Sequence, residues 1–263
     1  MKNIKILIFV VLAYLPFQIF AQDLIVYNSK YLSKPDSTLV FMPKGKSKAD
    51  QLPLVFMLHG YSGTYKQWDA ISNAQNYANE YGFIVVLPDG LYNSWYLNSP
   101  LLEKSQYEKF FIEELFQDII AKYTPNQNNI FITGLSMGGH GALSIFLNNL
   151  DKFKSGGSTS GAVDLRTLGS KYGIDVLLGK NASEELLNSF SVIENVKKLA
   201  GTDRTFIFDC GTEDQFYKMN NELKMLCDQL KIKATYISQP GGHNRAYWAK
   251  SIRQQMNFFK TLI

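Results

Sequence analysis

The stretch ITGLSMGGHGALS, residues 132–144, sets a single serine within a cluster of glycines. An apolar run, NIFITG, leads into it, and helix-forming residues follow it. A G-x-S-x-G pattern between a strand and a helix is typical of the nucleophile elbow, a turn so tight that the residues two before and two after the serine nearly collide. Here those positions are Gly134 and Gly138. The stretch therefore predicts that Ser136 is a nucleophile held above a sheet.

Two further glycines of the stretch, Gly139 and Gly141, fall within the predicted helix. Glycine in a helix costs about 1 kcal/mol relative to alanine, so another requirement must favour it. We expect both glycines to let the helix pack closely on neighbouring strands. The alternative for the whole motif is a glycine-rich strand-to-helix turn without chemistry.

Working outward from the elbow, apolar runs of strand length alternate with helical patterns. The runs are apolar on both faces, as in the strands of a covered parallel sheet. They span residues 52–60, 83–90, 129–134, 205–211 and 233–242. Helical spacing covers residues 107–123, 141–150, 214–230 and 245–262. This alternation predicts a doubly wound, mostly parallel α/β sheet with helices on both faces, which together with the elbow indicates the α/β-hydrolase fold.

Two further regions complete the expected domain. DLIVYNS and STLVFMP, residues 23–29 and 37–43, resemble an antiparallel strand pair that leads into the sheet. Residues 164–200 have weak strand signals and short helical patterns, so we expect an insertion over the carboxyl edge of the sheet. No repeat or linker divides the rest, and residues 22–263 are predicted to form a single domain.

The amino terminus carries a positive start, an apolar run and a small residue at position 21. This pattern predicts a secretory signal peptide over residues 1–21, and hence a periplasmic or extracellular protein. An uncleaved anchor is the alternative, but the apolar run is shorter than the roughly 20 residues of a spanning helix. The net charge of +4 includes Lys2 and Lys5 of this segment, so the remainder gives no electrostatic case for binding nucleic acid.

The chain has two cysteines, Cys210 at the end of a predicted strand and Cys227 late in the next helix. Their positions favour two buried free thiols over a disulfide. No Cys/His spacing suits zinc, and we expect neither a metal nor an organic cofactor.

A serine hydroxyl is a weak nucleophile without a base. Of the three histidines, His59 ends a strand and His140 lies inside the helix after the elbow, positions that favour structural roles. His243 follows the last strand, and it alone satisfies the order serine, acid, histidine that the hydrolase fold uses. We therefore predict His243 as the general base and acid.

The acid is expected after the strand that precedes His243. Asp214 falls just past that strand, where a loop carboxylate can orient the imidazole, although capping the next helix is its other possible role. Asp209 lies within the strand and is poorly placed, and Asp164 is the reserve candidate. For the oxyanion, we expect the backbone N–H groups of Met137 and Tyr61.

Several motifs, in order, resemble the esterase D-like family: HGYSGTYKQW, LPDG, NSWYLNSP, GLSMGGHGAL, CGTEDQF and PGGHNRAYW. This family includes S-formylglutathione hydrolases, tributyrin esterases, mycolyltransferases, and the feruloyl and acetylxylan esterases of carbohydrate esterase family 1. The resemblance implies a serine hydrolase with a triad of Ser136, Asp214 and His243. It implies oxyanion amides from Tyr61 and Met137.

The resemblance also places the loop with Trp95 and Tyr96 beside the active site, where both rings either bind a sugar or aromatic acyl group or pack the loop. A signal peptide argues against the cytosolic substrate S-formylglutathione. The substrate expected is therefore a small ester or an acylated plant polysaccharide with feruloyl or acetyl groups. An acyltransferase with the same triad and a catalytically silent binding module remain the alternatives.

Overall fold

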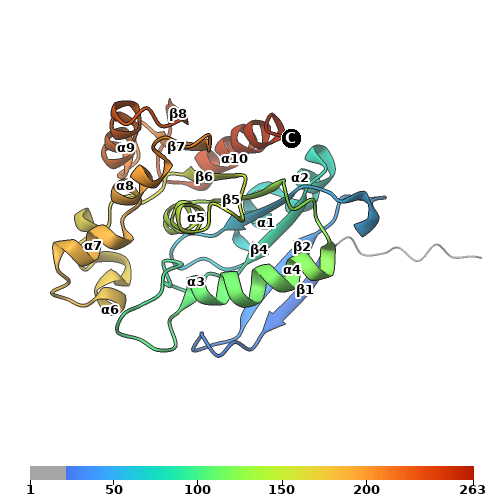
Figure 1. Cartoon of the computed structure of the whole chain (residues 1–263), viewed down its shortest axis with the longest axis horizontal. Coiled ribbons are helices and arrows are strands. Elements are labelled where there is room, and N and C mark those ends of the chain that lie inside the picture. The colour runs from blue at the N-terminus through green and yellow to red at the C-terminus, as the bar shows by residue number, and fades with distance from the viewer. Residues whose placement is uncertain (1–21) are drawn as a thin grey trace, which may run out of the picture.

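The computed structural model describes residues 22–263, so the predicted signal peptide lies outside the described residues. Within them, eight strands form one sheet in the order β1-β2-β4-β3-β5-β6-β7-β8 (Figure 1). The first two pairs, β1 with β2 and β2 with β4, run antiparallel, and all others run parallel. The strands are β1 (Gln22–Tyr27), β2 (Asp36–Phe41), β3 (Leu54–Leu58), β4 (Ile84–Pro88), β5 (Ile130–Gly134), β6 (Ser155–Thr159), β7 (Phe206–Gly211) and β8 (Ala234–Gln239).

Helices cover both faces of the sheet, as the sequence predicts. Alternate side chains of β3 enter two different cores: Phe56 packs with helices α3, α4 and α5, whereas Val55 packs with α1, α2 and α10. These helices are α1 (Gln67–Ser72), α2 (Ala74–Tyr81), α3 (Tyr107–Phe110), α4 (Phe116–Tyr123), α5 (Met137–Asn148) and α10 (Arg245–Lys260). Helix α9 (Tyr217–Gln229) joins the Phe56 core through Leu223.

One strand of the sheet, β6, was not predicted, because the prediction relied on apolar runs. β6 has the sequence SGGST, which shows no apolar run, yet every residue of it is buried. Its glycines explain this composition: a Cβ on Gly156 would lie 2.9 Å from the Phe146 ring, and one on Gly157 would lie 2.4 Å from the Gln255 side chain. Close packing from α5 on one face and α10 on the other therefore excludes larger side chains. Helices α1 and α2 were also not predicted.

The expected insertion consists of short helical segments beyond the carboxyl edge of the sheet (Figure 1). Its α-helices are α6 (Ile174–Leu178), α7 (Glu184–Phe190) and α8 (Val192–Asn195). The predicted helix over residues 107–123 forms, but its middle, Phe111–Leu115, winds as a π-helix between α3 and α4.

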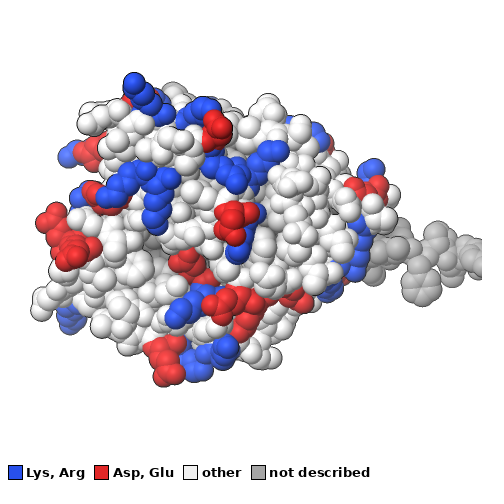
Figure 2. Space-filling view, in the orientation of Figure 1, with Lys and Arg blue, Asp and Glu red and all other residues white. Residues whose placement is uncertain are grey.

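The two cysteines are free and buried, as predicted. Burial raises the pKa of both thiols, to about 12 for Cys227, which keeps them in the unreactive protonated form. No helix within residues 22–263 is long and apolar enough to cross a bilayer. Figure 2 shows basic and acidic side chains spread over one face, so that face carries no single-sign field.

Candidate active site

The chain reverses direction at Ser136 in the tight turn that the sequence predicts. Ser136 has φ 55° and ψ −117°, a backbone conformation that L-residues rarely adopt. A Cβ on Gly134 would lie 2.2 Å from the carbonyl oxygen of Gly138, and a Cβ on Gly138 would lie 2.3 Å from the carbonyl oxygen of Leu58. Both glycines are therefore required by close backbone approach, and the strained turn holds the Ser136 hydroxyl above the ends of the strands.

The glycines inside α5 have two different neighbours. A Cβ on Gly139 would meet the Ser158 hydroxyl of β6 at 2.5 Å, which agrees with the expected helix–strand packing. A Cβ on Gly141 would instead lie 2.3 Å from the ring of Tyr96. The expectation that Gly141 faces a strand is thus wrong, because an aromatic ring from the 93–96 loop fills that space.

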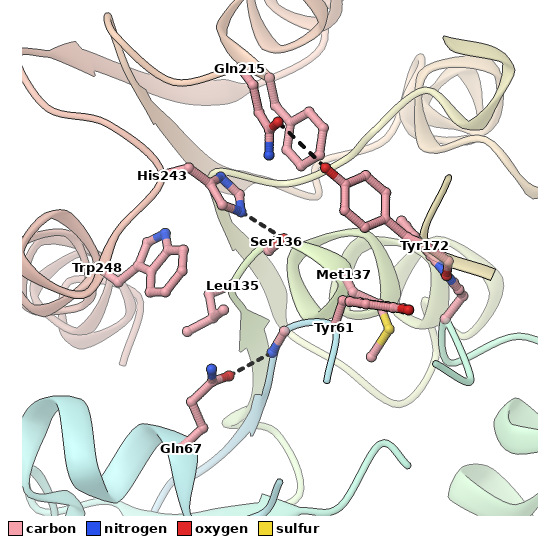
Figure 3. A pocket seen from close by; sticks show the side chains of 12 residues that line it. Tyr61, Gln67, Leu135, Ser136, Met137, Tyr172, Gln215, His243 and Trp248 are labelled. Atoms are coloured by element: carbon pink, nitrogen blue, oxygen red, sulfur yellow. Dashed lines mark hydrogen bonds between the residues drawn. The ribbon is translucent and has the colours of Figure 1, made fainter. Parts of the chain in front are cut away.

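Ser136, His243 and Asp214 form one hydrogen-bonded chain (Figure 3 shows the Ser136–His243 contact). The Ser136 hydroxyl donates to Nε2 of His243 at 2.9 Å, and Nδ1–H of His243 donates to Asp214 at 2.9 Å. The Asp214 side chain is fully buried, and it also accepts a hydrogen bond from the Phe216 N–H. This arrangement orients the imidazole so that its free lone pair faces the serine hydroxyl.

The other two candidate acids lie elsewhere. Asp164 forms two hydrogen bonds with the guanidinium of Arg166, at 2.8 and 2.9 Å. Asp209 is fully buried inside the sheet, and burial raises its pKa. Its carboxylate accepts hydrogen bonds from Thr159, Ser251 and Gln255. Neither carboxylate contacts the imidazole of His243.

The remaining two histidines are buried and have structural contacts, as predicted. Nε2 of His59 accepts a hydrogen bond from the Gly90 N–H at 2.6 Å, which joins the loops after β3 and β4. Nε2–H of His140 donates to the carbonyl of Phe190 at 2.9 Å, which ties α5 to the insertion. Burial lowers the pKa of His140 to about 4, so this side chain is neutral at physiological pH.

Tyr61 and Met137, whose backbone N–H groups are the expected oxyanion donors, both line the cavity that contains Ser136. Among residues 22–263, neither N–H has a hydrogen-bond acceptor. Gln67 helps to shape this loop, because its Oε1 accepts the N–H of Gly60 at 2.8 Å (Figure 3). Two unpaired amides beside a serine hydroxyl are able to stabilise a tetrahedral oxyanion.

The cavity has a volume of about 180 Å³. Trp95 lines it, as expected, and its Nε1–H donates to the carbonyl of Tyr172 at 3.0 Å. Tyr96 does not line the cavity: its ring is buried against α5, and its hydroxyl donates to the His59 carbonyl at 2.9 Å. Of the two alternatives for Tyr96, the structure supports packing, because this ring is buried inside the molecule and does not reach the cavity as the prediction of a substrate-binding role requires.

Sequence reasoning missed several residues of the cavity wall, which are Gln67, Tyr172, Gln215, Phe216 and Trp248. The rings of Phe216 and Trp248 each meet the His243 imidazole edge-on, with centroids 5.1 Å apart. Both lie within the motifs already quoted: Phe216 follows Asp214 by two residues and Trp248 follows His243 by five, so closeness to a predicted triad residue was the available signal. Tyr172 comes from the insertion, and no local pattern indicates it.

Residues 29–259 match the family model described as Putative esterase. The chain belongs to this esterase family. It is 26% identical to an acetyl esterase of Caldicellulosiruptor saccharolyticus, over 86% of this chain and 93% of the relative. It is also 26% identical to an S-formylglutathione hydrolase of Arabidopsis thaliana, over 80% of this chain and 81% of that one.

A solved structure of a fluorophosphonate-binding serine hydrolase, FphF of Staphylococcus aureus, superposes on this esterase with a TM-score of 0.80 at 21% identity. The superposition covers 91% of this chain and 98% of FphF. The predicted α/β-hydrolase fold and the predicted family are thus confirmed. The chain is a carboxylic ester hydrolase.

The buried His140 makes the stability of this esterase depend on pH. The unfolded imidazole titrates near 6.5 and the folded one near 4, so the unfolded state binds more protons between these values. Stability therefore falls as the pH drops from about 6.5 to about 4, by ~3 kcal/mol from this group. We expect His140→Gln to remove this loss.

The measurement is the difference in unfolding free energy between wild type and His140→Gln at several pH values. Taking the difference cancels the titration of buried carboxylates such as Asp209, which are present in both proteins. Parallel stability curves for the two proteins would contradict the prediction.

Proposed function

We propose that this esterase is a secreted serine esterase that cleaves short acyl esters, acetyl esters first, with Ser136, His243 and Asp214 as its catalytic triad. The alcohol part is proposed to be a sugar hydroxyl of plant polysaccharide. The proposed triad rests on the unbroken chain of hydrogen bonds from the Ser136 hydroxyl through His243 to the buried Asp214.

In the first step, His243 Nε2 takes the hydroxyl proton while Ser136 Oγ bonds to the ester carbonyl carbon. The carbonyl oxygen becomes an oxyanion, which the N–H groups of Tyr61 and Met137 stabilise. The oxyanion then collapses, the bond to the alcohol oxygen breaks, and His243 gives its proton to that oxygen. The products of this step are the free alcohol and an acyl-Ser136 ester.

In the second step, water attacks the acyl-enzyme and gives one proton to His243. Collapse of the second tetrahedral intermediate returns that proton to Ser136 Oγ and releases the carboxylic acid. Asp214 keeps the imidazole in the required tautomer throughout. The mechanism uses no metal and no organic cofactor.

The cavity favours a small acyl group. Its volume of about 180 Å³ lies below the roughly 300–1,000 Å³ of pockets that enclose drug-sized ligands. The relatedness to an acetyl esterase supports the same choice. A feruloyl group is the second candidate, because the rings of Trp95, Tyr172 and Phe216 border the cavity and would contact an aromatic acyl chain.

A matched pair of substrates tests the acyl group. We expect a kcat/KM for para-nitrophenyl acetate at least about tenfold above that for para-nitrophenyl ferulate, because the cavity accommodates the smaller acyl group. Both esters release the same phenolate, so the ratio reports the acyl side alone. Ser136→Ala supplies the background rate. A ratio in favour of the ferulate would replace the acetyl proposal with a feruloyl esterase.

Three rival functions differ from the proposed one in their products, their reactivity or their compartment. An acyltransferase would move the acetyl group to an added sugar acceptor faster than to water, which product analysis would detect. A silent binding module would not react with a fluorophosphonate at Ser136. An S-formylglutathione hydrolase would act on that thioester in the cytosol, which the proposed export excludes.

Export itself is tested at the amino terminus of the purified protein. We propose that residues 1–21 are removed, so protein recovered from the periplasm or medium should begin at Gln22. A mature protein that still begins at Met1 would contradict this.

A further inference from the structure

A second hollow lies beside the active-site cavity and has a volume of about 290 Å³. Lys66, Gln67 and Arg245 line it, together with the turn that contains Ser62 and Thr64. Gln67 borders both hollows, so the two meet at its side chain. Arg245 follows the catalytic imidazole of His243 by two residues. The second hollow therefore lies next to the cavity that contains Ser136.

The hollow carries positive charge that no carboxylate neutralises, although the ammonium of Lys66 lies 5.4 Å from the centre of the Tyr65 ring. Within residues 22–263, no carboxylate lies within 4.0 Å of Lys66 or Arg245. Arg245 donates to the carbonyl of Ala70 at 2.7 Å, which positions its guanidinium. The carboxylate of Asp69 on α1 is engaged elsewhere, because it accepts the N–H of Ala74.

The contact with Ala70 stabilises the position of Arg245, but the helix dipole opposes its charge. Arg245 is the first residue of α10, where the helix dipole makes a cation unfavourable. The first turn of α10 contains no acidic residue that would offset this charge. An anion bound in the hollow would be favoured both by the two cations and by the dipole of this 16-residue helix.

The proposed mechanism assigns the alcohol to the same side of the site as the hollow. In the proposed mechanism, His243 Nε2 protonates the alcohol oxygen, so the alcohol must lie against the imidazole. Figure 3 shows Gln67 and Trp248 on one side of Ser136, and Tyr61 and Tyr172 on the opposite side. The side of Gln67 continues into the second hollow, whereas Tyr61 and Tyr172 line the opposite side of the cavity.

We propose that Lys66 and Arg245 form a subsite for a carboxylate on the alcohol part of the ester, such as that of an acetylated sugar acid. This inference rests on the proposed function, because it assigns the leaving group of the same reaction. The acyl group would then occupy the small cavity, and the anionic alcohol would extend past Gln67 to the two cations.

Para-acetoxybenzoate and para-acetoxybenzamide are the probes, because they differ in one anionic group on the leaving phenol. We expect the ratio of their kcat/KM values to fall about three- to tenfold in the Lys66→Gln/Arg245→Gln double variant. The wild-type ratio should also fall as salt is raised, since exposed charges are screened. Intrinsic differences between the two phenols cancel when the ratio is compared between proteins.

Two control variants test whether the positive charge in the hollow causes the change in the ratio. Lys250→Gln removes an exposed cation of α10 that does not line the hollow, and it should leave the ratio unchanged. Arg245→Lys keeps the charge while altering the contact with Ala70. Its ratio of kcat/KM values should stay near that of wild type, whereas Arg245→Gln should lower the ratio. An equal loss in Arg245→Lys and Arg245→Gln would overturn the role of charge.

If the double variant still cleaves both esters and its ratio of kcat/KM values equals that of wild type, the subsite is overturned. Failure of wild type to cleave either ester above the rate of Ser136→Ala would instead overturn the proposed function.

A final comparison identifies the source of the carboxylate. Faster cleavage of an O-acetylated uronic acid than of S-acetylglutathione supports a sugar acid, and the reverse order would overturn that assignment in favour of a peptide thiol.

Discussion

Ser136→Ala is expected to lower kcat for para-nitrophenyl acetate by about 10⁵- to 10⁶-fold, the loss found when the nucleophile is removed from other triads. The variant keeps the strained turn but lacks the oxygen that forms the acyl-enzyme. Single-turnover kinetics with purified protein would measure the residual rate. The proposed oxyanion donors, the amides of Tyr61 and Met137, remain, so a small rate above that of water should persist.

The control for this variant is its fold. Alanine is smaller than serine, and Ser136 is partly exposed in the cavity, so the melting temperature should change little. A second readout is covalent labelling: wild type should gain the mass of a fluorophosphonate adduct, and Ser136→Ala should not. Activity near that of wild type in a folded variant would remove Ser136 from the mechanism.

Asp214→Asn is expected to lower kcat by about 10⁴-fold with a small change in KM. An amide at position 214 can donate a hydrogen bond to Nδ1, which would put the imidazole proton on Nε2. The lone pair that accepts the Ser136 proton would then face the wrong way. The structure makes this effect large, because Asp214 is fully buried and is the carboxylate that contacts His243.

Asp164→Asn is the matched control, because it makes the same chemical change at the reserve candidate. Asp164 is paired with Arg166 and does not contact His243, so this variant should keep kcat within a few-fold of wild type. A large loss of kcat in Asp164→Asn, with Asp214→Asn nearly unaffected, would reverse the assignment of the acid.

Much of the site could be predicted because its geometry depends on local backbone requirements. The turn at Ser136 needs glycines at 134 and 138, and these are visible in sequence. Ser136, Asp214 and His243 follow the parallel strands β5, β7 and β8, whose carboxyl ends lie at one edge of the sheet, so the three residues meet there. Local signals therefore identified the three side chains that the structure brings into contact.

Other features depend on contacts between distant segments and left no local signal. β6 is built of small residues because α5 and α10 approach it closely from either face. Trp95 and Tyr96 are adjacent and both have left-handed backbone, so the loop sends one ring to the cavity and the other into the core. Tyr172 reaches the cavity from a short 3-10 turn of the insertion, Lys171–Gly173, where its own backbone is left-handed and no local sequence pattern points to the cavity.

The hydrogen bond between Trp95 and the carbonyl of Tyr172 has a consequence for how the enzyme meets its substrate. It joins the insertion to the rim of the cavity while Ser136 stays accessible. Within residues 22–263, we therefore expect that no segment has to move at an oil–water interface before an ester reaches Ser136. Turnover should follow the concentration of dissolved ester in a simple hyperbola. Droplets or micelles formed above the solubility limit should add no further rate, in contrast to lipases that are activated at an interface.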